Sequence, residues 1–126
     1  MSSDISYKTE VLWVSNQRFR TLIEFALDVG EKSARSLEEV AFVRLLADDD
    51  ETALFNGCSF NLDERFQGVA AKKFWAAVFF DVARRIFLRQ VGNQDIDSWQ
   101  PSVICDAHLV GRMLDRAVRE QEPDTT

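Results

Sequence analysis

The chain has 126 residues, of which 46% are hydrophobic, including ten Phe and three Trp, and its net charge at pH 7 is −6. This length fits one domain with enough apolar side chains for a core, and the composition excludes an intrinsically disordered chain. The excess of negative charge opposes binding to a phosphate backbone and so excludes nucleic acid as an expected partner.

No apolar stretch is long enough to span a bilayer, since the longest, residues 75–80, is far shorter than a membrane helix requires. Residues 1–10 lack the basic and apolar pattern of a signal peptide. The two cysteines, Cys58 and Cys105, do not form the dense framework of a small secreted domain. We therefore expect a soluble, cytoplasmic protein that does not act at a membrane.

The first predicted helix runs from about Ser15 to Val29. Ser15 or Asn16 could cap its start, and Gly30 is expected to end it. Residues 11–14 form either a short strand or an earlier turn of this helix, because four residues are too few for periodicity to decide. Residues 1–10 are expected to be flexible. The apolar stripe of this helix consists of Phe19, Leu22, Ile23 and Ala26.

The second predicted helix begins at Ser36-Leu37-Glu38-Glu39, which matches a capping box. In such a box the Ser36 oxygen accepts from the Glu39 amide, and the Glu39 carboxylate accepts from the Ser36 amide. Aspartates are unfavourable at a helix C-terminus, where the helix dipole is negative, so the helix is expected to end at about Ala47. Its expected apolar face consists of Leu37, Val40, Ala41, Leu45 and Leu46, with Val43 off to one side.

The third predicted helix begins near Asn61, bends or restarts at Gly68 and ends at Gly92. From residue 70 to residue 91 its apolar side chains cover roughly 200° of the helical wheel, wider than a surface helix needs. This width predicts a central helix packed on most of its circumference. The apolar arc consists of Trp75, Val78, Phe79, Phe80, Val82, Ala83, Ile86 and Phe87. The polar side consists of Lys73, Asp81, Arg84 and Arg85. On it, Asp81 can pair with Arg84 or Arg85, which lie three and four residues further along the helix.

The fourth predicted helix runs from about Pro101 to Glu120, with Pro101 tolerated in its first turn. Gly111 on its apolar flank would allow another helix to approach closely. Residues 121–126 are expected to be flexible. Together the four helices predict an all-α fold, a compact four-helix bundle in one domain over residues 1–126, with a short irregular or strand-like N-terminal addition. The apolar stripe of this helix consists of Val103, Ala107, Val110, Leu114 and Ala117.

Catalytic and metal-binding patterns are weak. His108, the only histidine, lies three residues after Cys105, and a Cys–His pair can act as a nucleophile. The favoured interpretation is a small buried Cys105 and a surface or boundary His108, because a dyad also needs an oxyanion hole and the chain has no glycine-rich turn. A structural zinc site needs about four Cys or His ligands, and the chain has three such residues. We expect no metal, no cofactor and no enzymatic activity.

Two smaller features have competing interpretations. Arg112, Arg116 and Arg119 share one face of the last helix, which is either a solvated face or a basic patch for an acidic partner or a second subunit. Trp13 and Trp99 could be binding anchors, although packing in the core is the favoured interpretation.

The acidic segment from Leu45 to Glu64 is the most informative feature, because it holds six acidic residues and no basic one. The rest of the chain has 15 acidic and 15 basic residues, so the whole net charge lies in this segment. Carboxylates would steer a basic partner and aromatics would supply burial, whereas the alternative is a loop that only keeps the protein soluble. The candidate partner-binding residues are Asp48, Asp49, Asp50, Glu51, Phe55, Phe60, Asp63 and Glu64.

Three functional hypotheses follow from these features. The leading one is a protein-binding or inhibitory module that occludes a protein with a basic surface, for example a bacterial immunity or antitoxin protein that blocks a toxin or another enzyme. The second is a structural subunit that self-associates, with which a homodimer agrees. The third is a small-ligand carrier or enzyme with a cavity beside the third helix, using Cys105 and His108.

Overall fold

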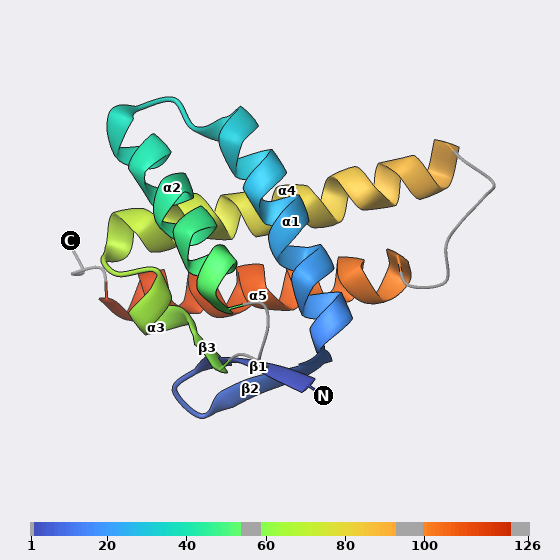
Figure 1. Cartoon of the computed structure of the whole chain (residues 1–126), viewed down its shortest axis with the longest axis horizontal. Helices are drawn as coiled ribbons and strands as arrows, with labels where there is room; N and C mark the ends of the chain where they lie inside the picture. Colours follow the sequence, from blue (N-terminus) through green and yellow to red (C-terminus); the bar gives the residue numbers. More distant parts are fainter. Residues whose placement is uncertain (1, 54–58, 93–99, 122–126) are drawn as a thin grey trace.

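The computed structural model describes residues 2–53, 59–92 and 100–121, and within them the chain forms helices beside one small sheet (Figure 1). The elements are β1 (Ser2–Tyr7), β2 (Glu10–Ser15), α1 (Asn16–Ser33), α2 (Leu37–Ala53), β3 (Ser59–Asn61), α3 (Leu62–Arg65), α4 (Val69–Gly92) and α5 (Gln100–Gln121). Helices α4 and α5 lie side by side, and the hairpin of α1 and α2 crosses them. Within the described ranges, no helix is both long enough and apolar enough to cross a membrane.

The sheet has the strand order β2-β1-β3, with β1 antiparallel to β2 and parallel to β3. Tyr7 pairs with Glu10 across a two-residue turn, in which Lys8 has a positive φ of 53°. Ile5 in the middle strand pairs with Leu12 on one side and Phe60 on the other. Alternation makes one face of β1 apolar, since Ile5 and Tyr7 are buried while Asp4 and Ser6 are partly exposed.

This sheet shows that the all-α prediction was wrong: the fold is mostly helical but includes three strands among the described residues. Residues 2–10, predicted to be flexible, belong largely to two of them. The period-two pattern in Ser3-Asp4-Ile5-Ser6-Tyr7 was missed because the buried position at its start is a serine. Of the two alternatives left open for residues 11–14, the strand is the one that forms.

Helix α1 begins as predicted and ends later than predicted. Ser15 is its N-cap, and its side-chain oxygen accepts from the Arg18 N–H at 3.1 Å. Gly30 does not end the helix, which continues to Ser33. Gly30 is instead a packing residue: a Cβ there would lie 3.3 Å from the Trp75 ring and from Val43. The glycine lets α1 approach both α4 and α2.

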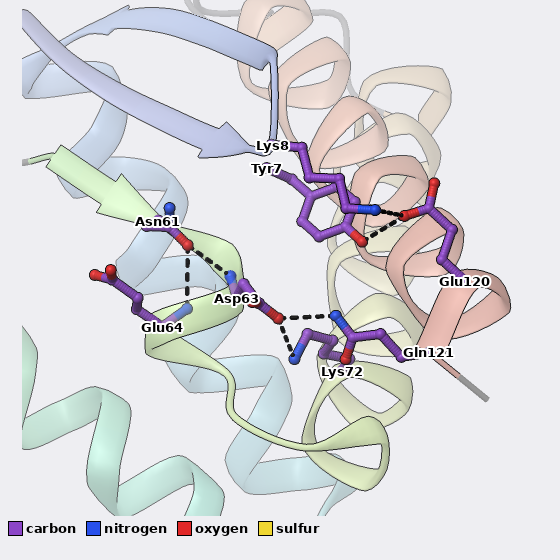
Figure 2. Close-up of polar contacts among 8 residues, drawn as sticks. All are labelled: Tyr7, Lys8, Asn61, Asp63, Glu64, Lys72, Glu120 and Gln121. Atoms are coloured by element: carbon purple, nitrogen blue, oxygen red, sulfur yellow. Dashed lines mark hydrogen bonds and ion pairs between the residues drawn. The ribbon is translucent and has the colours of Figure 1, made fainter. Parts of the chain in front are cut away.

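The third predicted helix is two helices, as the restart at Gly68 anticipated. Asn61 caps α3 by accepting from the amides of Asp63 at 3.0 Å and Glu64 at 3.1 Å (Figure 2). Gly68 then has a φ of +88°, a conformation that residues with a Cβ rarely adopt, and α4 begins at Val69. Asp81 pairs with both Arg84 and Arg85 on the exposed side of α4, as predicted.

The core is centred on α4 and is rich in aromatic rings. Trp75, Val78, Phe79 and Val82 are buried, in agreement with the predicted central helix, but Phe87 at the far end of the predicted arc is exposed. Phe66 links the sheet to this helix, because its ring lies 5.6 Å from that of Phe60 and stacks on Trp75 at 5.2 Å. These contacts hold α3 and β3 against α4.

Candidate protein-binding face

Helix α2 presents an exposed apolar stripe to solvent. Leu37, Ala41 and Leu45 are spaced four residues apart, so they lie on one side of the helix, which we call the outer stripe. Leu37 is 91% exposed and Leu45 is 62% exposed, and Ala41 is also exposed. Asp48 follows eleven residues after Leu37, close to three turns, and is exposed at the end of the same line.

The opposite side of α2 holds the helix on the rest of the molecule. Val43 and Leu46 are buried, and the ring of Phe42 lies 6.0 Å from that of Phe74 on α4. A helix with apolar residues on two opposite sides buries one of them and leaves the other available. The single apolar face predicted from residues 37–46 is therefore wrong, because that set divides between a core side and an outer stripe.

The start of α2 is fixed by the predicted capping box, with one change. The Ser36 oxygen accepts from the Glu39 amide at 3.1 Å as expected. The Glu39 carboxylate accepts from the Arg35 amide at 2.9 Å, one residue before the predicted donor. Leu37 thus becomes the first residue of the helix, where it projects into solvent.

Four of the six acidic residues of the predicted segment are part of α2 and not of a loop. The helix continues through Asp48, Asp49, Asp50 and Glu51 to Ala53, so the predicted end at Ala47 was wrong. The unfavourable dipole costs only about 0.3–1 kcal/mol per exposed charge, which does not stop a helix. The carboxylates and the negative end of the dipole add up to a strongly negative helix terminus. The side chains of residues 49–51 and the whole of Phe55 lie outside the described residues.

A groove of about 270 Å³ lies beside the outer stripe, between α2 and the corner of α3 and α4. Leu45 and Glu64 are on its walls, and Phe66 and Trp75 contribute aromatic surface to its lining. Leu45 therefore belongs both to the stripe and to the groove. Through this groove the structure brings two parts of the predicted segment, its start at residue 45 and its end at residue 64, to one face.

Two of the predicted binding residues make contacts with other parts of the same molecule. Phe60 is only 4% exposed, and its ring meets that of Phe19 edge to face at 5.4 Å. Asp63 accepts from Gln121 at 2.8 Å and pairs with Lys72 at 3.0 Å (Figure 2). These two interactions hold the pKa of the Asp63 carboxyl below its usual value, against the effect of burial.

Lys72 engages the Asp63 carboxylate within the protein, although the Asp63 side chain is still 55% exposed. The Lys72 side chain is 1% exposed, so its ammonium group needs a partner within the protein. Figure 2 shows the Asp63 carboxylate directed toward Lys72 and Gln121, whereas the Glu64 carboxylate points away from them. Both acidic residues at this end are on the surface, and they differ in that Asp63 is paired within the molecule.

In the described part of the chain, Cys105 and His108 make no hydrogen bond or ring contact with each other. Both are exposed, so the expectation of a buried Cys105 was wrong, and the His108 ring lies 5.5 Å from that of Phe80. Asp106 between them is buried and accepts from Arg18 at 2.6 and 3.1 Å. Burial raises the pKa of the Asp106 carboxyl, and the Arg18 guanidinium opposes that rise. Asp106 thus joins α5 to α1.

Grooves border α4, as the third hypothesis requires, but the residues that line two of them are not the ones that this hypothesis uses. One of about 420 Å³ lies between α1 and α4, and one of about 730 Å³ lies between α4 and the α1–α2 connection. Neither is lined by Cys105 or His108. Among the described residues, no group of three or more His, Cys, Asp or Glu side chains is placed to hold a metal ion.

Sequence reasoning missed the outer stripe because it assigned every apolar residue of this helix to the core. The four-residue spacing of Leu37, Ala41 and Leu45 was visible, and it differs from the spacing of Val43 and Leu46. For Trp13 the favoured interpretation, packing in the core, was wrong, since Trp13 is 65% exposed on β2. Trp99 lies outside the described residues. No protein-family model, curated protein or solved structure gives a significant match to this chain.

Proposed function

We propose that this chain is a protein-binding module whose α2 face recognises a partner surface with both apolar and basic side chains. The observation that carries this proposal is the outer stripe, exposed on a helix whose other side is buried and leading to Asp48. Contiguous exposed apolar side chains bordered by charged ones are typical of protein interaction sites.

The two leucines and the carboxylates would do different things. Full burial of a leucine side chain contributes roughly 1.5–3 kcal/mol, so Leu37 and Leu45 supply the anchors. The acidic end of α2, together with its helix dipole, attracts a basic surface from a distance and orients it. We therefore expect Leu37 and Leu45 to govern the dissociation rate, and the carboxylates to govern the association rate.

In its more specific form, the module acts by occlusion and covers a basic site on a toxin or another enzyme, in the manner of bacterial immunity and antitoxin proteins. Occlusion needs a firmly held binding face and no catalytic group. The capping of Ser36 and the burial of Val43 and Leu46 supply that support for α2. Helix α2 has six acidic residues and one basic residue, and this negative charge favours a partner with Lys or Arg at the contact.

The partner can be captured by photo-crosslinking in the cell of origin. A benzophenone amino acid placed at position 37 or 41 should give a covalent adduct with one protein, because both positions are on the outer stripe. The matched control is position 24 on α1, because Glu24 is exposed but does not belong to the outer stripe. Equal adducts at all three positions would contradict recognition by α2.

Binding kinetics with the captured protein then test the mechanism. Leu37→Ser and Leu45→Ser should speed dissociation, and Asp48→Lys should slow association and weaken its dependence on salt. Glu24→Lys changes charge by the same amount outside the face and should matter less. Unchanged rates in all the α2 variants would overturn the proposal, as would sedimentation showing that the stripe pairs only with a second copy of this chain.

A further inference from the structure

Strand β2 has an open edge. Among the described residues it pairs with β1 alone, because the strand order is β2-β1-β3. The edge strands of natural sheets are usually protected from pairing by a lysine, a proline or a bulge, or because the strand is very short. The opposite edge strand, β3, is of the short kind, since it has only three residues. β2 is six residues long and has neither lysine nor proline. Its single charged residue, Glu10, is paired with Arg116. This edge is therefore accessible to another strand.

The register of the hairpin shows which backbone groups are available. Tyr7 and Glu10 flank a two-residue turn, which makes them a pair that shares backbone hydrogen bonds. Because this pairing alternates along an antiparallel ladder, Leu12 also directs its N–H and C=O toward β1. Val11 and Trp13 direct theirs to the open edge, and their side chains are 47% and 65% exposed.

A groove of about 350 Å³ lies beside the first half of this strand, between residues 10–12 of β2 and α5. Val11 and Leu12 form one side, and Leu109 and Met113 of α5 contribute apolar surface to the other. An extended segment placed here would pair with β2 and lay alternate side chains into the groove.

The charges that line the groove favour an acidic segment. Arg112 and Arg116 both line it, and Arg116 is already paired with Glu10. Arg112 is exposed and has no ion-pair partner in the described part of the chain. We propose that the β2 edge binds an extended, acidic peptide segment of another protein by strand addition, with Arg112 as the charge partner. This surface is separate from the α2 face, so the inference does not rest on the proposed function.

A second copy of the chain fits this edge less well. Two β2 strands would bring together identical sequences, Glu10-Val11-Leu12-Trp13-Val14-Ser15, in which Glu10 is the only acidic residue. Since Glu10 is already paired with Arg116, Arg112 would remain unpartnered in such a dimer. An acidic peptide supplies the missing charge.

The probe is an eight-residue, end-capped peptide that alternates valine and glutamate, titrated into the ¹⁵N-labelled full chain. We expect the amide signals of Val11 and Trp13 to shift and to become protected from solvent exchange, while those of α2 stay unchanged. The same peptide with N-methyl groups on alternate amides cannot complete the ladder, and we expect it not to bind. A valine–lysine peptide should bind at least roughly tenfold more weakly.

Variants of the chain complete the test. Arg112→Glu should weaken binding of the acidic peptide roughly tenfold. Arg20→Glu should not weaken it, because Arg20 is an exposed arginine of α1 outside the groove. Leu37→Ser should leave peptide binding unchanged, which keeps this result distinct from any failure at α2. The proposal is overturned if the peptide does not bind, if lysine and N-methyl peptides bind equally well, or if sedimentation shows a dimer that the peptide cannot dissociate.

Discussion

Gly111 of α5 sets how closely the two longest helices approach each other. A Cβ at this position would lie 2.9 Å from two atoms of the Phe80 ring on α4 and 3.1 Å from the ring atom nearest the backbone. Such distances require the ring itself to move. The prediction from sequence that Gly111 permits close approach of a helix is confirmed.

We expect Gly111→Ala to lower the free energy of unfolding by about 1–3 kcal/mol, as for other overpacked core sites. In a Phe80→Leu background the same change should be neutral or stabilising, since alanine is favoured over glycine within a helix by about 1 kcal/mol. Chemical denaturation of the four proteins forms a double-mutant cycle. Equal effects of Gly111→Ala in both backgrounds would show that Phe80 is not the obstacle.

Asp63 is the main counter-charge of a buried lysine. Its pKa lies below the usual value of 3.8, because Gln121 and Lys72 favour the ionised carboxylate. The unfolded chain therefore binds a proton at this residue more readily than the folded one. The stabilisation is present above pH 3.8 and is lost as the pH falls through the lower pKa of the folded state.

Because the Asp63 carboxylate is 55% exposed and partly screened by solvent, Asp63→Asn should reduce stability at pH 7 by only about 0.5–1 kcal/mol, and stability should fall less steeply below pH 4. Glu64→Gln is the matched control, because Glu64 is the next residue and its carboxylate points away from Lys72. Urea denaturation of the three proteins at several pH values provides the measurement. The same acid dependence in Asp63→Asn and in the unmodified chain would refute the assignment.

At the scale of the element, α2 has two apolar sides with different energetic roles. We expect Leu46→Ala to cost about 2–5 kcal/mol, because Leu46 is buried, and Leu45→Ala to change stability by less than about 0.5 kcal/mol. These adjacent residues are matched in chemistry and in helix propensity. Thermal or chemical unfolding would distinguish them, and similar losses would mean that Leu45 is packed as tightly as Leu46.

The helices were predictable from the sequence because each carries a local pattern. Ser15, Ser36 and Asn61 cap helices as expected, and Gly68 breaks one where only a positive φ fits. The strands were predictable only in part: a strand was one alternative for residues 11–14, but β3 is three residues long and pairs with a segment more than fifty residues away. Periodicity detects local order and gives no information on such pairing.

The candidate site was predictable only in part. Charge counting found the acidic end of α2 at Asp48, since charge is visible in sequence. It could not show that Asp63 serves Lys72 or that Phe60 belongs to the core, because both depend on residues brought together by the fold. Exposure of Leu37 and Leu45 likewise depends on which side of α2 meets α4.

At the scale of the whole molecule, the first strand is tied to the last helix. The Tyr7 hydroxyl donates to Glu120 at 2.7 Å, and Lys8 pairs with the same carboxylate at 2.6 Å (Figure 2). Burial raises the pKa of Tyr7 above 10.0, and Glu120 raises it further. The folded chain therefore keeps the phenol proton at a pH where the unfolded chain loses it.

This stabilisation is complete below pH 10.0 and is lost as the pH rises through the higher pKa of the folded state. Tyr7→Phe should be less stable than the unmodified chain at pH 7, and the difference should shrink above pH 10. Since Tyr7 is the only tyrosine, phenolate absorbance reports its titration directly. A phenol that titrates at its ordinary pH in the folded protein would contradict the tie to Glu120.

The central strand of the sheet, β1, is synthesised before its two partners, β2 and β3. Its hairpin with β2 can close early, but the side that later receives β3 stays bare until the ribosome has made some fifty further residues. During that interval the unpaired edge of β1 can form backbone hydrogen bonds with a strand of another chain. The chain thus has a window of vulnerability during translation that ends only when residues 59–61 arrive.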